Sequence, residues 1–292
     1  MVSRREIAQA MHDPKKGFRH AILRVRELAA NPVSARCLVC GSRRTRLRLV
    51  ARPKRTYEIR ICQRCQYVSN AGNTVDYTSF ESVKRFRLTP RVGTAEHQGR
   101  EFHMARMGID ILHRQGLDVM VFGAGRSLDY RHIAKLPQVR SVVMSDVVDL
   151  GVDADFINIT KGTNRRFDLI IACEVVEHFP DPLKEFPRLL ELVARNGLLA
   201  CSTNIYDGKN VAPHTYLYGR GHVSYYSPHA IRLISRRSRM LFDFRVPAIV
   251  TGTAGPRKRY VLFSRSSKVM QDVAEYFGNH TYAPSEEVRP TD

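Results

Sequence analysis

The sequence predicts an α/β protein: a doubly wound, mostly parallel sheet with an antiparallel hairpin at its C-terminal edge, preceded by a small metal-binding module. Strand-like apolar runs alternate with helix-like runs from about residue 96 onward. This alternation is typical of a parallel sheet that carries helices on both faces. The last two strand-like runs, 241–249 and 259–264, have no helical pattern between them. They therefore predict the antiparallel hairpin.

Hydrophobic spacing predicts the other elements of the α/β part. Apolar residues there recur either at helical spacing or in short continuous runs. We expect helices over 96–114, 128–134, 183–193 and 227–235, and strands over 118–122, 142–144, 167–172 and 198–202. The last of these helices begins with Ser227 and Pro228, which is a helix-start pattern.

The chain divides into five segments on this basis. Residues 1–34 are basic and helix-prone, 35–70 hold two cysteine pairs, 71–95 form a polar linker or flap, 96–268 form the α/β domain, and 269–292 form a tail. Packing on its own protein is the simplest role for the N-terminal helix. Contact with a membrane surface is the alternative, because the segment is basic.

Length and charge limit the classes of function. A chain of 292 residues suits one large and one small domain. No apolar run approaches the roughly 18 residues of a membrane-spanning helix, and no signal peptide is recognisable, so a cytoplasmic location is expected. The net charge of +19 favours an anionic partner such as nucleic acid, anionic lipid or a phosphorylated acceptor. Arginines scattered along the whole chain also fit an ordinary solvated surface.

The two cysteine pairs have the spacing of a zinc site. Cys37 and Cys40 form the first Cys-x-x-Cys turn, and Cys62 and Cys65 form the second, with 21 residues between the turns. Two strands and a hairpin turn fill that length and bring the four thiolates together. Four protein ligands leave no open position on a tetrahedral ion, so the zinc is expected to be structural. Paired cysteines in a cytosolic chain are more often metal ligands than disulfides.

A glycine loop follows the strand at 118–122. Gly123 and Gly125 let backbone N–H groups approach a ligand closely where the strand leads into a helix. A dinucleotide fingerprint requires a third glycine at position 128, which is Leu128 here. Asp146 ends the next strand, and an acid at that place can bind both hydroxyls of a ribose. The pattern therefore favours a nucleoside-containing cofactor.

A third motif, 167–182, runs from a strand into Glu174, Glu177 and His178. A helical turn would place these three side chains on one face, because they stand at i, i+3 and i+4. Ligands of open α/β sheets bind at the carboxyl ends of the strands, which is where this segment lies.

These motifs, in this order, resemble the class I S-adenosylmethionine-dependent methyltransferases over residues 118–264. The segment 221–228 also resembles a stretch found in many of those enzymes, and 35–70 resembles the zinc ribbon that precedes sugar-modifying members. The resemblance implies a seven-stranded sheet and a cofactor site. The implied cofactor-binding residues are Phe122, Gly123, Ala124, Gly125, Ser127, Asp146, Val147, Asp155, Phe156, Cys173 and Glu174. Two positions depart from the family pattern: Val121 replaces an acid, and Ser127 replaces a third glycine.

Methyl transfer to a hydroxyl requires a base, and histidine is the natural base near neutral pH. His178 and His222 are the candidates, with Glu177 as the residue that orients them or as an alternative base. An Asp-Asp-Asn metal cluster of the catechol type is not recognisable, so metal-free transfer is expected. The tyrosine- and histidine-rich stretch 204–221 is expected to carry acceptor specificity.

The sequence therefore supports three functional hypotheses. The first is a methyltransferase for a small molecule, with a sugar, nucleotide-sugar or glycan hydroxyl as acceptor. The second is an RNA methyltransferase, which the net charge favours. The third is a cofactor-binding or scaffold protein without transfer activity, which Val121 and Ser127 suggest.

Overall fold

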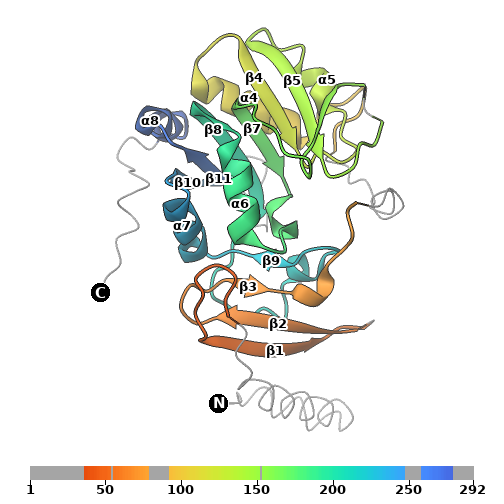
Figure 1. Ribbon diagram of the computed structural model, residues 1–292, viewed down its shortest axis with the longest axis vertical. Helices are drawn as coiled ribbons and strands as arrows, with labels where there is room; N and C mark the ends of the chain where they lie inside the picture. Colours follow the sequence, from red (N-terminus) through yellow and green to blue (C-terminus); the bar gives the residue numbers. More distant parts are fainter. Residues whose placement is uncertain (1–35, 54, 79–91, 152, 247–257, 279–292) are drawn as a thin grey trace.

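The computed structural model describes residues 36–53, 55–78, 92–151, 153–246 and 258–278. These residues form two sheets that lie one above the other in Figure 1. The basic segment 1–34 lies outside the described residues, as does 279–292 of the expected tail. Among the described residues, none of the helices has the length and apolar character needed to cross a membrane.

The larger sheet has seven strands in the order β10-β11-β8-β7-β4-β5-β6. Its strands are β4 (Leu117–Phe122), β5 (Val139–Asp146), β6 (Asp155–Asn158), β7 (Phe167–Cys173), β8 (Val193–Asn204), β10 (Leu241–Arg245) and β11 (Lys258–Ser264). The five strands from β4 to β8 pair in parallel, while β11 is antiparallel to both β8 and β10. The predicted fold class and its antiparallel edge hairpin are therefore confirmed.

Helices cover both faces of this sheet. On one face lie α4 (Arg100–Leu112), α5 (Asp129–Ile133) and α8 (Ser267–Tyr276), and on the other lie α6 (Pro182–Glu191) and α7 (Pro228–Arg237). Helix α8 crosses the domain boundary expected at residue 268. Its first turn is capped by the Ser266 side chain, which accepts from the Val269 N–H, and Val269, Met270 and Val273 are buried against the sheet.

Side chains along the central strands point alternately into two separate hydrophobic cores, one on each face of the sheet. In β7, Ile170 and Ala172 pack with α6 and α7, whereas Leu169, Ile171 and Cys173 pack with α4, α5 and α8. All five are buried. Strands buried on both faces read as continuous apolar runs, which is why the sequence pattern located them.

The smaller sheet has the strand order β1-β2-β3-β9. The hairpin of β1 (Thr45–Ala51) and β2 (Thr56–Cys62) agrees with the sequence pattern, and β3 (Val68–Ser69) extends it. Its fourth strand, β9 (Ser224–Tyr225), comes from the far end of the α/β domain. The segment that the sequence predicts as a zinc ribbon therefore shares its sheet with a distant part of the chain, since β9 pairs with the edge strand β3.

Candidate functional site

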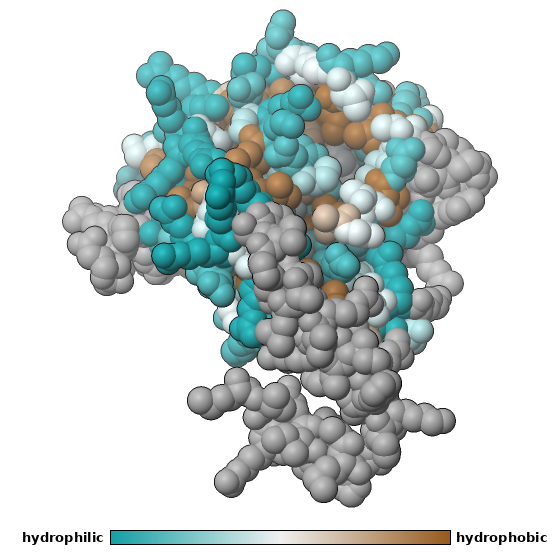
Figure 2. Space-filling view, turned by 60° about the horizontal axis from the view of Figure 1, so that its bottom comes forward, coloured by the Kyte–Doolittle hydropathy of each residue, from teal (hydrophilic) through white to brown (hydrophobic). Residues whose placement is uncertain are grey.

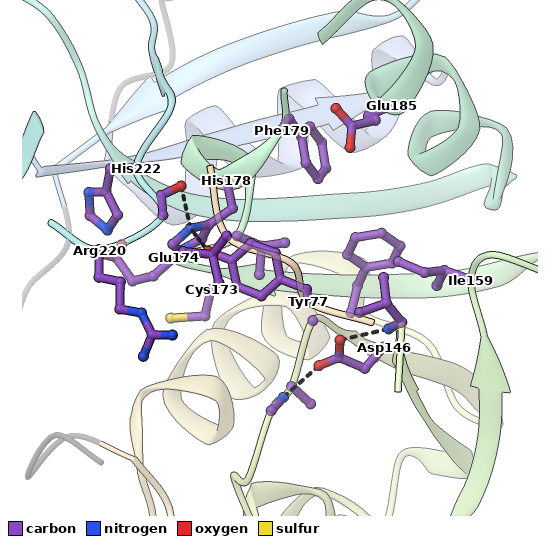
Figure 3. Close-up of a pocket in the computed structure, with 18 of the residues that line it drawn as sticks. Tyr77, Asp146, Ile159, Cys173, Glu174, His178, Phe179, Glu185, Arg220 and His222 are labelled. Atoms are coloured by element: carbon purple, nitrogen blue, oxygen red, sulfur yellow. Dashed lines mark hydrogen bonds between the residues drawn. The ribbon is translucent and has the colours of Figure 1, made fainter. Parts of the chain in front are cut away.

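A cavity of about 680 Å³ lies at the carboxyl ends of β4, β5 and β7, as expected for an open α/β sheet. This volume is in the range of small-molecule and cofactor sites. The glycine loop, the start of α4 and the segments 74–78 and 220–223 also line it. Figure 3 shows side chains from these separate segments pointing toward a shared space. In Figure 2, hydrophobic side chains appear in separate areas among hydrophilic ones on the face that is shown.

The glycine loop adopts a conformation that its two glycines permit. Gly123 has φ +68° and Gly125 has φ +55°, in the region that other residues rarely adopt. A Cβ on Gly123 would also lie 2.6 Å from Cγ2 of Val175. A side chain at position 123 would therefore collide with Val175, whereas a Cβ on Gly125 would meet nothing within 4 Å.

Asp146 ends β5 and lines the cavity next to the glycine loop. Its carboxylate accepts hydrogen bonds from the Gly125 N–H at 3.0 Å and from the Val147 N–H at 2.7 Å (Figure 3). Burial raises the pKa of Asp146, while the two backbone donors lower it. Two fixed donors hold the carboxylate in one orientation, which suits a pair of vicinal hydroxyls.

The structure does not bring Asp155 and Phe156 to the cavity. They begin β6, a strand that the sequence pattern did not predict, and β6 runs parallel to β5 with Val143 opposite Asp155. Both residues thus lie at the amino end of the strand, and the Asp155 carboxylate pairs with Arg165 at 2.7 Å. Ile159, just beyond the carboxyl end of β6, lines the cavity instead.

The segment after β7 departs from regular strand geometry as it enters the cavity. Glu174 has φ +58°, a strained value for a residue other than glycine, and its carboxylate accepts from the Ser202 hydroxyl at 2.8 Å. Cys173 is buried, and its thiol lies 3.3 Å from the same hydroxyl. The expected helical turn here is the short 3-10 turn η2 (Val176–His178).

His178 and His222 line the cavity together, with ring centroids 4.9 Å apart. Nδ1 of His178 lies 2.9 Å from the Gly221 carbonyl, and Nδ1 of His222 lies 2.6 Å from the Tyr216 carbonyl. Because a carbonyl oxygen only accepts, each Nδ1 carries the proton in the neutral ring, and Nε2 carries the lone pair. Both imidazoles are therefore in the tautomer that offers Nε2 as a base.

Glu177 lies behind the cavity wall. Its side chain is fully buried and accepts hydrogen bonds from the Tyr216 hydroxyl at 2.6 Å and the Thr203 hydroxyl at 3.3 Å. Tyr216 in turn packs its ring on His222, with centroids 4.5 Å apart. Glu177 is absent from the cavity lining, so in this arrangement it orients Tyr216 and His222.

Tyr77 and Arg220 line the cavity and were not predicted from the sequence. The Tyr77 hydroxyl lies 2.6 Å from Nδ1 of His178 (Figure 3), and a Cβ on Gly221 would overlap that hydroxyl. The polar stretch around Tyr77 has no periodic pattern that could have placed it. The sequence predicts only a linker or a flap there, and the described part of that stretch reaches the cavity.

Glu177, His178 and His222 also form a group whose ligand atoms lie within 4.8 Å of one another, so they could hold a metal ion. The expectation of metal-free transfer therefore stays a prediction.

The four paired cysteines converge as the spacing predicts. Their sulfurs all lie within 4.8 Å of one another, with Cys37 to Cys65 and Cys40 to Cys62 each at 3.5 Å. A tetrahedral zinc with 2.3 Å bonds separates its sulfurs by about 3.8 Å, whereas a disulfide would bring two of them to about 2.05 Å. Backbone N–H groups donate to the sulfurs of Cys37 and Cys62, which helps to hold thiolates in place for a metal. The cluster fits a structural zinc.

Comparison with known proteins supports a methyltransferase domain in this part of the chain. Residues 97–238, slightly under half of the chain, match the family model described as a methyltransferase domain. A ubiquinone biosynthesis O-methyltransferase of Cereibacter sphaeroides is 31% identical over 112 residues. That alignment covers 34% of this chain and 45% of the relative, so it spans less than half the length of that enzyme.

Solved structures give more distant similarities. A 1,6-didemethyltoxoflavin-N1-methyltransferase of Burkholderia thailandensis, with its substrate and S-adenosylhomocysteine bound, is 19% identical at a TM-score of 0.41, covering 56% of this chain and 76% of that one. An O-methyltransferase family protein from the same organism is 14% identical at a TM-score of 0.45, covering 57% of this chain and 55% of that one. Similarity at this level says nothing about the acceptor of this chain.

Proposed function

We propose that this chain is an S-adenosylmethionine-dependent methyltransferase that acts on a hydroxyl of a small molecule. The observation that carries the proposal is that one cavity is lined by both parts of such a site. The glycine loop and Asp146 lie on one side of it, and His178 and His222 lie on another. The match of residues 97–238 to the methyltransferase-domain family supports the same function.

The residues fit the cofactor. Gly123 and Gly125 line the cavity, and the oriented Asp146 carboxylate is placed to accept from the two ribose hydroxyls. When bound, S-adenosylmethionine supplies an activated methyl group on a sulfonium. The protein's tasks are to position the acceptor and to remove its hydroxyl proton.

Either imidazole can serve as the base. The Gly221 carbonyl and the Tyr77 hydroxyl hold His178 through Nδ1, and the Tyr216 carbonyl holds His222 in the same way. Nε2 of the aligned ring then accepts the proton from the acceptor hydroxyl. The Glu177 carboxylate lies near both rings and favours the imidazolium that forms.

The cysteine cluster completes the proposal as a structural zinc site. Its four sulfurs leave no ligand position for substrate, and it lies outside the cavity lining. A carbohydrate acceptor, which the zinc-ribbon resemblance suggests, finds no support in the comparisons. A screen for the methyl acceptor should therefore test sugars, nucleotide sugars and phenols without preference among them.

Binding of S-adenosylhomocysteine tests the cofactor site. Titration calorimetry of the zinc-loaded chain is expected to give micromolar affinity. In Asp146→Ala the affinity should fall about 100-fold, because two charge-assisted hydrogen bonds are lost. Asp149→Ala is the matched control, since Asp149 is exposed on the following loop. Failure of the folded wild type to bind would leave the scaffold hypothesis in its place.

A further inference from the structure

Glu101 is a buried carboxylate that the proposed reaction does not use. It stands in the first turn of α4, is 4% exposed, and lines the cavity. Burial raises its pKa to about 7, and the neighbouring Arg100 lowers it. A buried acid facing a cavity requires a reason, because burial without a partner is costly.

Ser127, Arg100 and Asp129 hold the Glu101 side chain, and the hydrogen bond to the Asp129 side chain raises the pKa of Glu101 further. The Ser127 hydroxyl donates to its Oε2 at 3.4 Å, and the Nε of Arg100 lies 3.5 Å from its Oε1. The Arg100 charge also acts on Cys173 and Glu174 at the end of β7. Glu101 is therefore part of a polar cluster on the β7 side of the glycine loop.

Both positions that depart from the family pattern, 121 and 127, are connected with Glu101. Val121, where the pattern has an acid, is buried in the same core as Phe102 and Ala105 of α4. Position 121 thus faces the helix that carries Glu101. Ser127, at the third glycine position, supplies the hydroxyl that donates to Glu101. Strand β4 thus carries no acid at position 121, and the helix that packs against this position carries Glu101.

We propose that Glu101 replaces the acid missing at position 121, and that its carboxylate binds the α-ammonium group at the amino-acid end of the cofactor, with Ser127 as a positioning residue. This inference rests on the proposed function. In it, the ammonium N–H groups donate to the Glu101 carboxylate, which is ionised in the complex.

The sheet topology places the two ends of the cofactor site apart. Asp146 ends β5, Cys173 ends β7 and is followed by Glu174, and β4 with its glycine loop lies between these two strands. Two strand spacings separate the outer strands by about 10 Å. An extended cofactor whose ribose lies at Asp146 therefore crosses the glycine loop and ends at the cluster that contains Glu101.

The test compares two ligands on three proteins. S-adenosylhomocysteine and its analogue without the α-amino group are titrated into wild type, Glu101→Gln and the control Glu96→Gln, because Glu96 is exposed outside the cavity. We expect Glu101→Gln to weaken S-adenosylhomocysteine about 10- to 100-fold, the range for a hydrogen bond to a charged group, and to leave the desamino analogue within about 2-fold. Glu96→Gln should change neither.

Every other outcome contradicts either the inference about Glu101 or the proposed function. Equal losses for both ligands would assign Glu101 a purely structural role, and no loss for either would remove it from the site. Both results overturn the inference while leaving the proposed function intact. A wild type that binds neither ligand instead overturns the proposed function itself.

A second variant covers the case in which Glu101→Gln does not fold. Ser127→Gly restores the family's glycine and removes the hydroxyl that positions Glu101. It should weaken S-adenosylhomocysteine by about 3- to 10-fold and the desamino analogue by less than about 2-fold, because the Ser127 hydroxyl acts on the ligand only by positioning the Glu101 carboxylate. Equal effects on the two ligands would again contradict the inference.

Discussion

The cysteine-rich region and the cofactor cavity were both located from short motifs, but the first is formed by one short segment and the second by segments that are distant in the sequence. All four clustered cysteines lie within residues 37–65, while the cavity draws on segments spread from residue 74 to residue 223. We call residues 36–70 the four-cysteine module. The two Cys-x-x-Cys turns predicted which four cysteines cluster, but they did not predict that β9 completes the sheet of this module. The cavity motifs predicted the glycine loop, but they did not predict the parts of the wall formed by residues 74–78 and by the start of α4.

The four-cysteine module contacts the segment that carries His222, and side-chain hydrogen bonds join the two. Asn70 Nδ2 donates to the Leu217 carbonyl at 2.9 Å, and just beyond the module Asn73 Nδ2 donates to the His222 carbonyl at 3.1 Å. The Ser227 hydroxyl, which caps α7, donates to the Cys65 carbonyl at 2.5 Å. The segment that presents His222 to the cavity is thus held by the four-cysteine module and by Asn73 just beyond it. In contrast, the hydrogen bonds that orient Asp146 and Glu101 come from within the α/β domain.

Loss of a cysteine ligand is the largest expected perturbation. Cys65→Ser should remove the zinc and lower Tm by about 10 °C or more, because structural zinc supplies several kcal/mol or more to folding. Cys65 belongs to the same buried core as Phe186 and Tyr226. We therefore expect one unfolding transition at a lower temperature in calorimetry, with zinc content measured in parallel.

Cys201→Ala is the matched control for that variant. Cys201 is a buried thiol in the same core but lies on β8, away from the cysteine cluster. Its loss should cost about 1–2 kcal/mol and leave the zinc in place. Full zinc content in Cys65→Ser, or an unchanged Tm after the zinc is lost, would show that the module is not held by metal.

The same contrast shows what a single sequence can and cannot reveal. Strands such as β7 were located because burial on both faces makes them continuously apolar. Strand β6 has only four residues, Asp155-Phe-Ile-Asn158, too few for a recognisable apolar run, and the cofactor residues expected there lie at its amino end, outside the cavity lining. Strand β9 is two residues long and pairs with a segment about 155 residues earlier, which periodicity cannot detect.

The special position of Glu101 could have been recognised in the sequence. It stands at i, with Ala105, Gly108, Ile109 and Leu112 at i+4, i+7, i+8 and i+11, so an acid occupies the apolar face of a helix. An acid on such a face is expected to point at a partner or a site. Tyr77 had no comparable signal, because the stretch around it has no period at all.

A smaller change, Asn70→Ala, tests whether the contacts of the four-cysteine module affect cofactor binding. Asn70→Ala removes the donor to the Leu217 carbonyl while the cysteines stay intact. We expect a loss of about 1–3 kcal/mol in the free energy of unfolding, because a buried acceptor is left without its partner. Amide hydrogen exchange over 215–223 should speed up, and S-adenosylhomocysteine affinity should stay within about 2-fold.

Asn210→Ala controls for the loss of an asparagine from the neighbouring loop. Asn210 is exposed, and its side chain accepts from the nearby Ala212 N–H. Its loss should change stability by no more than about 0.5 kcal/mol. If Asn70→Ala weakened cofactor binding as strongly as Asp146→Ala, the two regions would form one unit and the contrast between them would fail.

The smallest expected effect is the pH dependence of cofactor binding. The charged and titratable groups that face Glu101 are Arg100 on its own helix, Asp129 on α5, and Cys173 and Glu174 at the end of β7. Burial raises the pKa of Glu101 to about 7. Binding of an ammonium group needs the ionised form, so S-adenosylhomocysteine affinity should rise with pH through this value and fall below it.

Between pH 7.5 and pH 6 the ionised fraction of such a group falls roughly 8-fold, and the affinity should fall by up to that factor. The range stops at pH 7.5, where Glu101 is mostly ionised and the ligand's α-amino group is still protonated. Glu185 also lines the cavity and has its pKa raised by burial to about 7, so it could give the same profile. Glu101→Gln should flatten the profile and Glu185→Gln should preserve it, because Glu101 lies in the cluster beside the glycine loop and Glu185 lies on α6. The reverse result would assign the titration to the α6 side of the cavity and remove the ammonium partner from α4.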